Sequence, residues 1–509
     1  MLPRPDAVDA AVESPADVPI VEDDHLDDVS VYLPSWLASM VVHLALVLLL
    51  ALVTVVGKRG DGLSDLLISV DSSAANGSLE NLDSQMSQTS ELELQSVEVP
   101  SELPVAPPLD ETAPSIALVE PVAAPPGQVD IAPPAAAIGT SEGGNSLEMR
   151  LDPTNRAYLL QSEGGTAQSE AAVERALHWL AEHQRQNGSW TFQHDKHPDC
   201  AGACGNPGFT PGNIAATAMA LLPFLGNGQT HLEGKYQKNV ELGLKHLVSS
   251  VETRGDLGSL YEQGGQMYGH GLAAIALCEA YGMTHDKFLH GPAQAVVNFI
   301  SEAQDPVGGG WRYMPRQPGD TSVVGWQLMA LKSAQMAYLR VPPGVMRKAG
   351  YFLDRVQSDR GAVYGYQAPE RGRPATTAIG LLCRIYLGWK HEEPPLVRGI
   401  SVLSTLGPSI EHSRLQNNMY YNYYATQVLH HYGGEDWKRW NNVMRDYLID
   451  TQATDGHEAG SWFFAGSDHG TGAGGRLYCT ALAAMTLEVY YRYMPLYRPQ
   501  TAPAAVEPK

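Results

Sequence analysis

The chain has no cluster of basic side chains. Its 34 lysines and arginines are outnumbered by 56 aspartates and glutamates, which gives 509 residues a formal charge of −22. Proteins that bind nucleic acids gather lysine and arginine on one face, so a nucleic-acid partner is not expected. Cysteine is also scarce, with five residues, and that number does not decide between a reducing and an oxidising compartment.

The acidity is confined to the amino-terminal third of the chain. Residues 1–32 carry nine acids and one arginine, and residues 58–165 carry seventeen acids and four bases. Residues 166–509 are nearly balanced, with thirty acids and twenty-nine bases. We expect 1–32 to be a disordered acidic tail, 497–509 to be a disordered carboxy-terminal tail, and 166–496 to be the folded domain.

Aspartate, glutamate, lysine and arginine are all missing from Trp36 to Val56. These 21 residues suffice to cross a hydrocarbon core of about 30 Å as a helix. The preceding segment is acidic, whereas a signal peptide begins with a basic region. The sequence therefore predicts a single-pass transmembrane helix within residues 33–57 that stays attached to the protein.

Two features of this segment disagree about its orientation. Lys58 and Arg59 follow it, which favours a cytoplasmic carboxyl side by the positive-inside rule. Ser39 and His43 share one helix face, and Ser-x3-His in an anchor before a proline-rich spacer resembles the TonB-type energy-transducing anchors. This resemblance implies a periplasmic domain on a cell-membrane anchor and a proton-channel partner for Ser39 and His43. The alternative is a neutral histidine bonded to a backbone carbonyl.

Regular hydrophobic spacing is absent from residues 58–165. Pro100 to Pro134 contains ten prolines among alanine, valine and acids, too little apolar surface to offset the entropy of ordering. The sequence predicts a disordered acidic and proline-rich linker. Fully extended, this stretch would be roughly 110 Å long. Its role would be either to reach a distant partner or to serve as a solubilising tether.

The rest of the chain repeats one unit. Helices that are apolar almost all round, and therefore buried, are expected to begin near Asn213, Tyr268, Asp320, Arg373, Tyr420 and Arg476. Amphipathic helices alternate with them near 171–184, 239–250, 292–303, 346–357, 397–405 and 440–452. Repeats that cannot bury their own apolar faces must stack. The prediction is an all-α domain, a six-repeat α/α toroid with six inner and six outer helices.

A short motif recurs after the outer helices. Gln184 to Trp190, QRQNGSW, has the Q-x3-G-x-W spacing of the repeat in squalene and oxidosqualene cyclases. Looser versions run from Gln304 to Trp311, from Gln357 to Tyr364, and from Gln452 through Gly456 to Trp462. Residues 168–496 therefore resemble the squalene/oxidosqualene cyclase and protein prenyltransferase superfamily. The resemblance implies a toroid of prenyltransferase/squalene oxidase repeats, and a shared fold does not imply a shared activity.

The acid of the cyclases is missing. The resemblance of this chain to the cyclases implies protonation of a double bond or an epoxide by the middle acid of a D-x-D-D motif. Asp320 and the four residues after it match the end of that pattern, but Gly319 stands where the acid should be and Gln317 replaces its neighbour. We expect Asp320 to be a helix N-cap rather than a strong acid.

The zinc ligands of the prenyltransferases are missing as well. That chemistry needs an Asp-x-Cys pair and a distant histidine. Cys479 has Asp468 and His469 upstream but lacks the Asp-x-Cys spacing, so we expect a small buried thiol. Cys278 and Cys383 are expected to pack in the same way.

A second set of candidate metal ligands lies within eleven residues: His194, His197, Cys200 and Cys204. Their spacing matches no common zinc signature. A Cys200–Cys204 disulfide is the simpler expectation in a periplasmic domain. We therefore expect no metal and no cofactor, with these four as the weak candidates.

The amino-terminal ends of the inner helices are expected to gather at one mouth of the toroid. Helix amino termini offer unpaired N–H groups and partial positive charge, which suit an anionic or polyhydroxylated ligand. Candidate ligand-binding residues are Arg373, Tyr420, Asn422, Arg476 and Tyr478, and weak catalytic candidates are Asp320, Tyr268 and His270. The alternative for each is a cap or a turn residue.

These features favour a membrane-anchored toroid, noncatalytic or divergent, that binds an anionic, isoprenoid or glycan ligand or a partner through its mouth. One alternative is a divergent isoprenoid cyclase or prenyltransferase. Another is a polysaccharide lyase on a similar toroid, in which Tyr268 or His270 abstracts a proton and Arg373 or Asn422 steadies a uronate. A deep apolar cavity would favour an isoprenoid, an open polar groove would favour a glycan, and a plugged centre would favour a purely structural module.

Overall fold

The computed structural model describes residues 147–497, apart from the single positions 263, 371, 414 and 467. The predicted transmembrane segment, both predicted tails apart from Tyr497, and most of the predicted linker lie outside these residues. Among the helices that the structure describes, none combines the length and the apolar character that a bilayer span requires.

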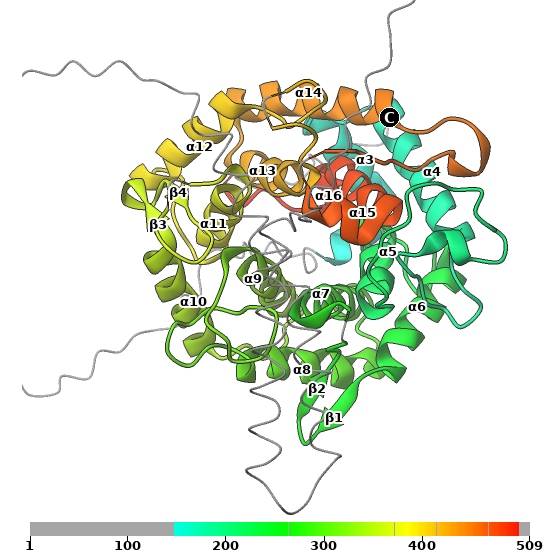
Figure 1. Cartoon of the computed structure of the whole chain (residues 1–509), viewed down its shortest axis with the longest axis horizontal. Helices are drawn as coiled ribbons and strands as arrows, with labels where there is room; N and C mark the ends of the chain where they lie inside the picture. The colour runs from blue at the N-terminus through cyan, green and yellow to red at the C-terminus, as the bar shows by residue number, and fades with distance from the viewer. Residues whose placement is uncertain (1–146, 263, 371, 414, 467, 498–509) are drawn as a thin grey trace, which may run out of the picture. The chain divides into compact units, whose positions relative to one another are not determined.

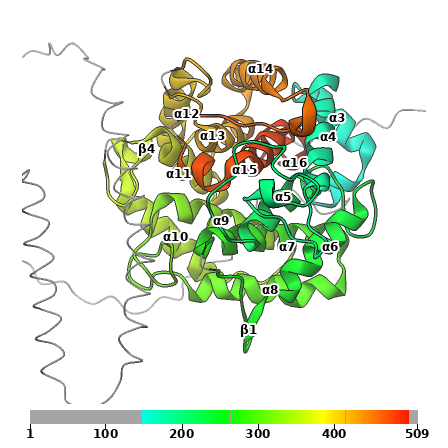
Figure 2. The same ribbon diagram turned by 45° about the vertical axis from the view of Figure 1, so that its right-hand side comes forward.

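Outer and inner helices alternate along the described chain, as predicted, and Figure 1 shows the inner helices encircled by the outer ones. The turned views show the same two layers (Figure 2), an arrangement that resembles an α/α toroid. The outer helices are α4 (Ala167–Glu182), α6 (Gln237–Ser249), α8 (Lys287–Glu302), α10 (Pro343–Val356), α12 (Pro394–Leu406) and α14 (Gly434–Thr451). The inner helices are α5 (Ile214–Gly226), α7 (Gln266–Thr284), α9 (Thr321–Met336), α11 (Pro374–Tyr386), α13 (Met419–Tyr432) and α15 (His469–Leu487).

Side-chain periodicity accounts for the two layers. Every residue of α5 is buried, because this helix has neighbours on all sides. Outer helix α10 buries only a stripe that includes Val345, Ala349 and Phe352, which recurs at helical spacing and faces the core. Polar residues cover its other side.

The motif tryptophans anchor each turn to the preceding outer helix. Each buried indole N–H donates to a backbone carbonyl near the end of that helix, which satisfies two polar groups at once. These bonds join Trp190 to Leu180 (2.7 Å), Trp311 to Ile300 (2.8 Å) and Trp462 to Leu448 (2.8 Å).

The motif glycines and glutamines dock each turn on the next outer helix. Gly188, Gly309 and Gly460 all have positive φ angles, and a Cβ on any of them would approach a backbone oxygen of that helix to within 2.4 Å. Only glycine fits there. The glycine that serves the last repeat is therefore Gly460 and not Gly456, which sequence spacing had suggested.

The same contact between a motif turn and an outer helix closes the ring. Gln452, from the last repeat, donates to the carbonyl oxygens of Ala172 in α4 and of Gly460, both at 2.8 Å. Gln304 makes the equivalent pair of bonds to Gly309 and Val345 within the ring. The first outer helix thus takes the place of a seventh, so the seam between the first and last repeats uses the ordinary repeat contact.

The first loop and the last inner helix also pair through their backbones at the seam. The amides of Phe209 and Thr210 donate to the carbonyls of Gly472 and Ala473. Helix α15 is interrupted at Gly475, where φ is 58° and ψ is −148°. It begins at His469, before the predicted start near Arg476, because the chain ahead of the break is itself helical.

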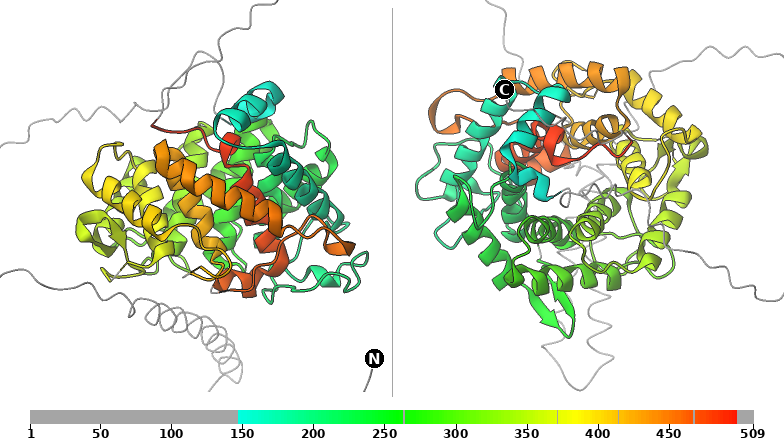
Figure 3. Two further views of the ribbon diagram at one scale, coloured as in Figure 1. Left: turned by 90° about the horizontal axis from the view of Figure 1, so that it is seen from above. Right: turned by 180° about the vertical axis from the view of Figure 1, so that it is seen from behind.

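Residues 147–162 correct the predicted extent of the disordered linker. They form a 3-10 helix, η1 (Glu148–Leu151), and α3 (Pro153–Ser162). Leu147 is fully buried, and buried Arg150 donates to the carbonyl oxygen of Arg492 at 2.7 Å. Figure 3 shows α3 beside the short helix α16 (Val489–Arg492), against which it packs. Contacts with residues far along the chain order this segment.

Short elements complete the fold. Two-stranded antiparallel hairpins are formed by β1 (Glu252–Arg254) with β2 (Leu257–Ser259) and by β3 (Gln357–Ser358) with β4 (Val363–Tyr364). Single 3-10 turns are η2 (His194–Lys196), η3 (Asp359–Gly361) and η4 (Gly456–Glu458). The turns η2 and η4 lie in the loops that meet at the seam.

Candidate functional site

Four tyrosines from four repeats meet at the amino-terminal ends of inner helices. The hydroxyls of Tyr313 and Tyr366 are 2.7 Å apart, and the ring of Tyr313 lies 6.0 Å from that of Tyr268. The hydroxyl of Tyr268 is 2.5 Å from Oγ of Ser322, and Tyr420 donates to the carbonyl of the same serine at 3.3 Å. We call Tyr268, Tyr313, Tyr366 and Tyr420 the tyrosine cluster.

Asp320 is the acid of this cluster, and it caps α9 as the sequence predicts. Its Oδ1 accepts from the amide of Val323 at 2.9 Å and from the hydroxyl of Ser322 at 2.5 Å. Its Oδ2 lies 3.9 Å from Nε of Arg312. Helix N–H groups and a guanidinium favour the carboxylate form. Burial and then the charge of Asp320 raise the pKa of Tyr366, so that phenol stays neutral.

Two arginines lie against the cluster. The guanidinium of Arg312 is 5.2 Å from the ring of Tyr313, and that of Arg373 is 5.7 Å from the ring of Tyr366. Nη2 of Arg373 donates to Glu370 at 3.3 Å, whereas its Nη1 is buried without a hydrogen-bond partner among the described residues. A buried charged donor without an acceptor is costly, and a bound anion would supply the acceptor.

Asp468 supports the cluster from the last repeat. It caps α15 and accepts from the amide of Tyr420 at 2.8 Å, from the amide of Gly470 at 2.8 Å and from the hydroxyl of Tyr478 at 3.0 Å. Burial raises the pKa of Asp468, and these hydrogen bonds oppose that effect. The hydroxyl of Tyr478 is thus engaged within the protein.

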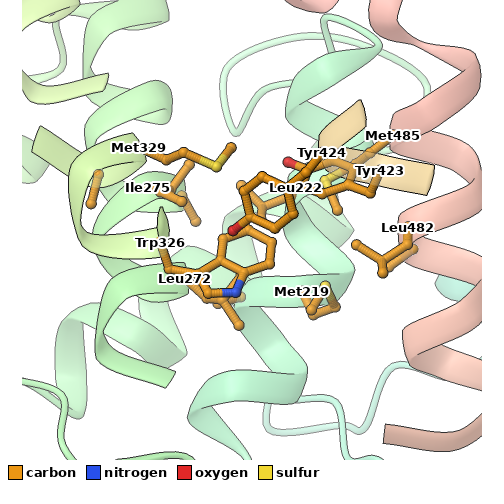
Figure 4. Close-up of a cluster of buried hydrophobic side chains, with 14 of the residues drawn as sticks. Met219, Leu222, Leu272, Ile275, Trp326, Met329, Tyr423, Tyr424, Leu482 and Met485 are labelled. Atoms are coloured by element: carbon orange, nitrogen blue, oxygen red, sulfur yellow. The ribbon is translucent and has the colours of Figure 1, made fainter. Parts of the chain in front are cut away.

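An apolar interior begins one helical turn beyond the cluster. The ring of Tyr424 lies 5.1 Å from that of Tyr420 and 5.5 Å from that of Trp326. Figure 4 shows a cluster of buried apolar side chains that includes Trp326 and Tyr424. The labelled residues are Met219 and Leu222 of α5, Leu272 and Ile275 of α7, Trp326 and Met329 of α9, Tyr423 and Tyr424 of α13, and Leu482 and Met485 of α15.

Three of the predicted site residues lie elsewhere. His270 is fully buried, with Nδ1 accepting from the amide of Leu260 and Nε2 donating to the carbonyl of Val296, both at 3.1 Å. Asn422 bonds both backbone groups of Ser409. Their helix positions suggested the mouth, but on a helix neighbouring residues point in different directions, and these two face outer segments.

Arg476 is the third predicted site residue that lies away from the tyrosine cluster. Its guanidinium donates to the carbonyl of Gly205 at 3.1 Å and to Oγ of Ser461 at 3.1 Å, and it pairs with Glu458 at 2.8 Å. Every one of these partners lies at the seam. Arg476 therefore ties the first loop to the last repeat instead of facing a ligand at the cluster.

A group of four potential metal ligands also lies at the seam. His183, Cys200, Cys204 and His457 bring one ligand atom each to within 4.8 Å of one another. Sγ of Cys204 is 3.5 Å from Nε2 of His183 and 3.1 Å from Nδ1 of His457. The two cysteines are free thiols, so the disulfide expected between them is not formed.

The two histidines predicted for this group are not part of it. Both ring nitrogens of His197 are engaged, one with the carbonyl of Gln184 at 3.1 Å and the other with the amide of Asp199 at 3.2 Å. His194 presents its ring edge-on to Trp179 and lies 5.9 Å from the ring of His183. Two of the four predicted candidates are therefore replaced by His183 and His457.

Part of the tyrosine cluster and its surroundings is not among the residues that the sequence predicts. Arg312 and Tyr313 directly follow a motif tryptophan, which was a usable signal, since that tryptophan fixes the turn. Tyr366 follows a looser version of the motif, and its position gave no such signal. Asp468 carried a signal of its own, because its place before the last inner helix is that of an N-cap.

No family model matches the sequence, and no curated protein matches it. The similar solved structures include a variant of the type II terpene cyclase MstE from Scytonema in complex with geranylgeranyl dihydroxybenzoate. It has 12% identity and a TM-score of 0.45, over 64% of this chain and 97% of its own. They also include a variant of the α-1,6-mannanase GH76A of Salegentibacter in complex with α-1,6-mannotriose, with 12% identity and a TM-score of 0.44, over 64% and 99%. These two enzymes act on unlike substrates, and at this similarity neither indicates what this chain binds.

Proposed function

We propose that this domain is a noncatalytic binding module for an amphipathic anion. The anionic head would lie at the tyrosine cluster beside Arg373, and an isoprenoid-like tail would lie among the apolar side chains around Trp326. The observation that carries the proposal is the buried Nη1 of Arg373, which has no partner among the described residues and whose guanidinium lies against the ring of Tyr366.

The chemistry of the cluster suits an anion. Arg373 and Arg312 supply cationic donors, and the neutral hydroxyls of Tyr313 and Tyr366 can donate as well. Guanidinium groups bind carboxylate and phosphate oxygens with two parallel hydrogen bonds. Glu370 already neutralises part of the charge of Arg373, so a ligand would compete with a partly exposed carboxylate that can turn to solvent.

The apolar side chains around Trp326 favour a hydrocarbon tail on the ligand. Ligand sites in proteins are largely apolar with a few polar groups that fix orientation. Trp326 stacks on Tyr423 with ring centroids 5.6 Å apart, and these aromatic faces, with the methionine and leucine side chains of Figure 4, offer contacts to a branched hydrocarbon. A glycan would need polar partners along its whole length, which this interior does not present among the labelled side chains.

The lyase alternative loses two of its four residues. His270 and Asn422 bond outer backbone groups, and so they do not join Tyr268 and Arg373. The cyclase alternative keeps one observation in its favour, since burial raises the pKa of Asp468 beside the cluster. Both oxygens of that carboxyl already accept hydrogen bonds from the protein, which is the arrangement of a cap.

Binding by the purified full-length chain tests the proposal. The probes are geranyl diphosphate, geraniol and inorganic diphosphate, and titration calorimetry measures the affinity of the chain for each. We expect geranyl diphosphate to bind more tightly than either half. Arg373→Gln should weaken the binding of geranyl diphosphate by at least about tenfold, which corresponds to the loss of one charged hydrogen bond. It should leave the affinity for geraniol unchanged. Arg398→Gln, at a half-buried position on α12 where the side chain donates to the carbonyl of Asp359, is the matched control. Equal binding of inorganic diphosphate would contradict a site for the tail.

The membrane anchor and its orientation are part of the same proposal. We propose that Trp36 to Val56 spans the cell membrane with the helical domain on the periplasmic side, and that Ser39 and His43 contact a proton-channel partner. Alkaline phosphatase and green fluorescent protein fused after Val105 report the side of the membrane. Active phosphatase is the expected result, and fluorescence with inactive phosphatase would place the domain in the cytoplasm.

A further inference from the structure

We propose that His183, Cys200, Cys204 and His457 bind one zinc ion that clasps the first repeat to the last. The four ligand atoms are all within 4.8 Å of one another. His183 follows outer helix α4, the cysteines lie on the first loop, and His457 lies in η4, 253 residues after Cys204. Only closure of the ring brings these segments together.

The donor set is that of a structural zinc site. Two thiolates and two imidazoles in a tetrahedron, with no position left for water, hold Zn²⁺ in many small domains. With Zn–S near ~2.3 Å and Zn–N near ~2.0 Å, sulfur and nitrogen ligands are separated by about 3.5 Å. The Cys204 sulfur lies 3.5 Å from the His183 nitrogen and 3.1 Å from the His457 nitrogen. Small side-chain rotations would complete the tetrahedron.

The surroundings orient the ligands. Nδ1 of His183 lies 2.7 Å from the carbonyl oxygen of Trp179, so that nitrogen carries the proton and Nε2 is left to bind a metal. Metal-bound histidines characteristically donate their second N–H in this way. The side chains of Cys200 and Cys204 are almost completely buried, whereas His457 is half-buried. Zinc can therefore enter from the side of His457.

Bonds that do not involve the four ligands hold the two loops in place around them. The amide of Gly205 donates to Glu458 at 2.7 Å, and Arg476 pairs with Glu458 at 2.8 Å. These contacts fix the residue after Cys204 and the residue after His457. The site is thus preformed by the seam, and a bound ion would add a tie to the bonds of Glu458 and to the backbone pairing that already join these segments. Without a metal, the thiol of Cys204 has the carbonyl of His457 as a partner at 3.3 Å.

Metal analysis of the purified full-length chain tests this site. Elemental mass spectrometry should find one zinc per chain, or one taken up after addition of zinc chloride and desalting. Cys204→Ser and His457→Gln should each abolish that zinc. His197→Gln, on the same loop but outside the four, is the matched control and should retain it.

A second measurement guards against misfolded variants. Wild-type chain freed of metal by chelation and reloaded with cobalt(II) should show a thiolate-to-cobalt charge-transfer band, and zinc should displace it. The melting temperature should fall on chelation and recover with zinc. No metal uptake by the folded wild-type chain, zinc retained in His457→Gln, or a mass 2 Da lower that marks a Cys200–Cys204 disulfide would each overturn the proposal.

Discussion

The carboxylate of Glu279 lies 2.8 Å from Nη1 of Arg150, although 129 residues separate them. The same oxygen accepts from Arg492 at 2.9 Å, and all three side chains are buried. Burial alone would raise the pKa of Glu279, but the two guanidiniums lower it. This triad fastens η1 and the carboxy-terminal segment to α7, at the far end of that inner helix from Tyr268.

Glu279→Gln should therefore be strongly destabilising. It leaves buried Arg150 without its counter-charge and leaves Arg492 with Glu488 alone, 3.6 Å from its Nη1, and breaking a buried ion pair in this way costs about 3–5 kcal/mol. Urea unfolding followed by circular dichroism measures the loss. Glu435→Gln removes the carboxylate of an exposed pair with Lys438 and should leave the unfolding midpoint unchanged. A triad variant as stable as this control would contradict the role given to Glu279.

Stability should fall as the pH is lowered, in part because of His270. Burial lowers its pKa from 6.5 to about 4. A depressed pKa means that the unfolded chain takes up the proton first, so the stabilisation is complete above pH 6.5 and is lost as the pH falls through about 4. The loss amounts to about 3 kcal/mol.

Unfolding free energies measured across this range in the wild type and in His270→Gln give the test. The variant should be less stable at pH 7 and should show a shallower dependence on pH, since it has no group to titrate. Parallel curves for the two proteins would show that His270 does not titrate in this window.

The break in α15 predicts a glycine requirement. Gly475 has φ of 58° and ψ of −148°, and a Cβ there would lie 2.3 Å from the amide nitrogen of Gly208. Gly475→Ala should cost at least about 1–3 kcal/mol from the backbone alone. Gly472→Ala is the control, because its Cβ would meet Phe209 at an ordinary 3.5 Å and helix propensity favours alanine. A smaller loss at Gly475 than at Gly472 would contradict the described seam.

The repeat pattern was readable from the sequence because its causes are local. Helix burial follows from side-chain spacing, and the motif residues act within one turn and the next outer helix. Asp320 could be recognised as a cap for the same reason. His457 could not be paired with Cys204, nor Arg476 with Glu458, because those contacts exist only after the ring closes. The order of residues 147–162 likewise depends on distant partners such as Arg492.

The domain should not cyclise a polyene by protonation. Asp320 lies beside Arg312 and accepts two hydrogen bonds as a cap, which favours the ionised form, whereas protonation of an alkene needs a neutral and strong acid. The purified chain incubated with squalene should yield no polycyclic product by mass spectrometry. Product that disappears in Asp320→Asn or in Asp468→Asn would identify the acid and would end the noncatalytic assignment.

Photo-cross-linking of the full-length chain with a prenyl diphosphate that carries a diazirine at the end of its tail tests the central proposal most directly. The account predicts cross-links on α9 and α13, at or near Trp326, Met329 and Tyr423, and competition by unlabelled geranyl diphosphate. It also predicts that Arg373→Gln weakens the labelling and Arg398→Gln does not. Labelling confined to the outer helices and insensitive to Arg373→Gln would contradict a ligand held inside the ring.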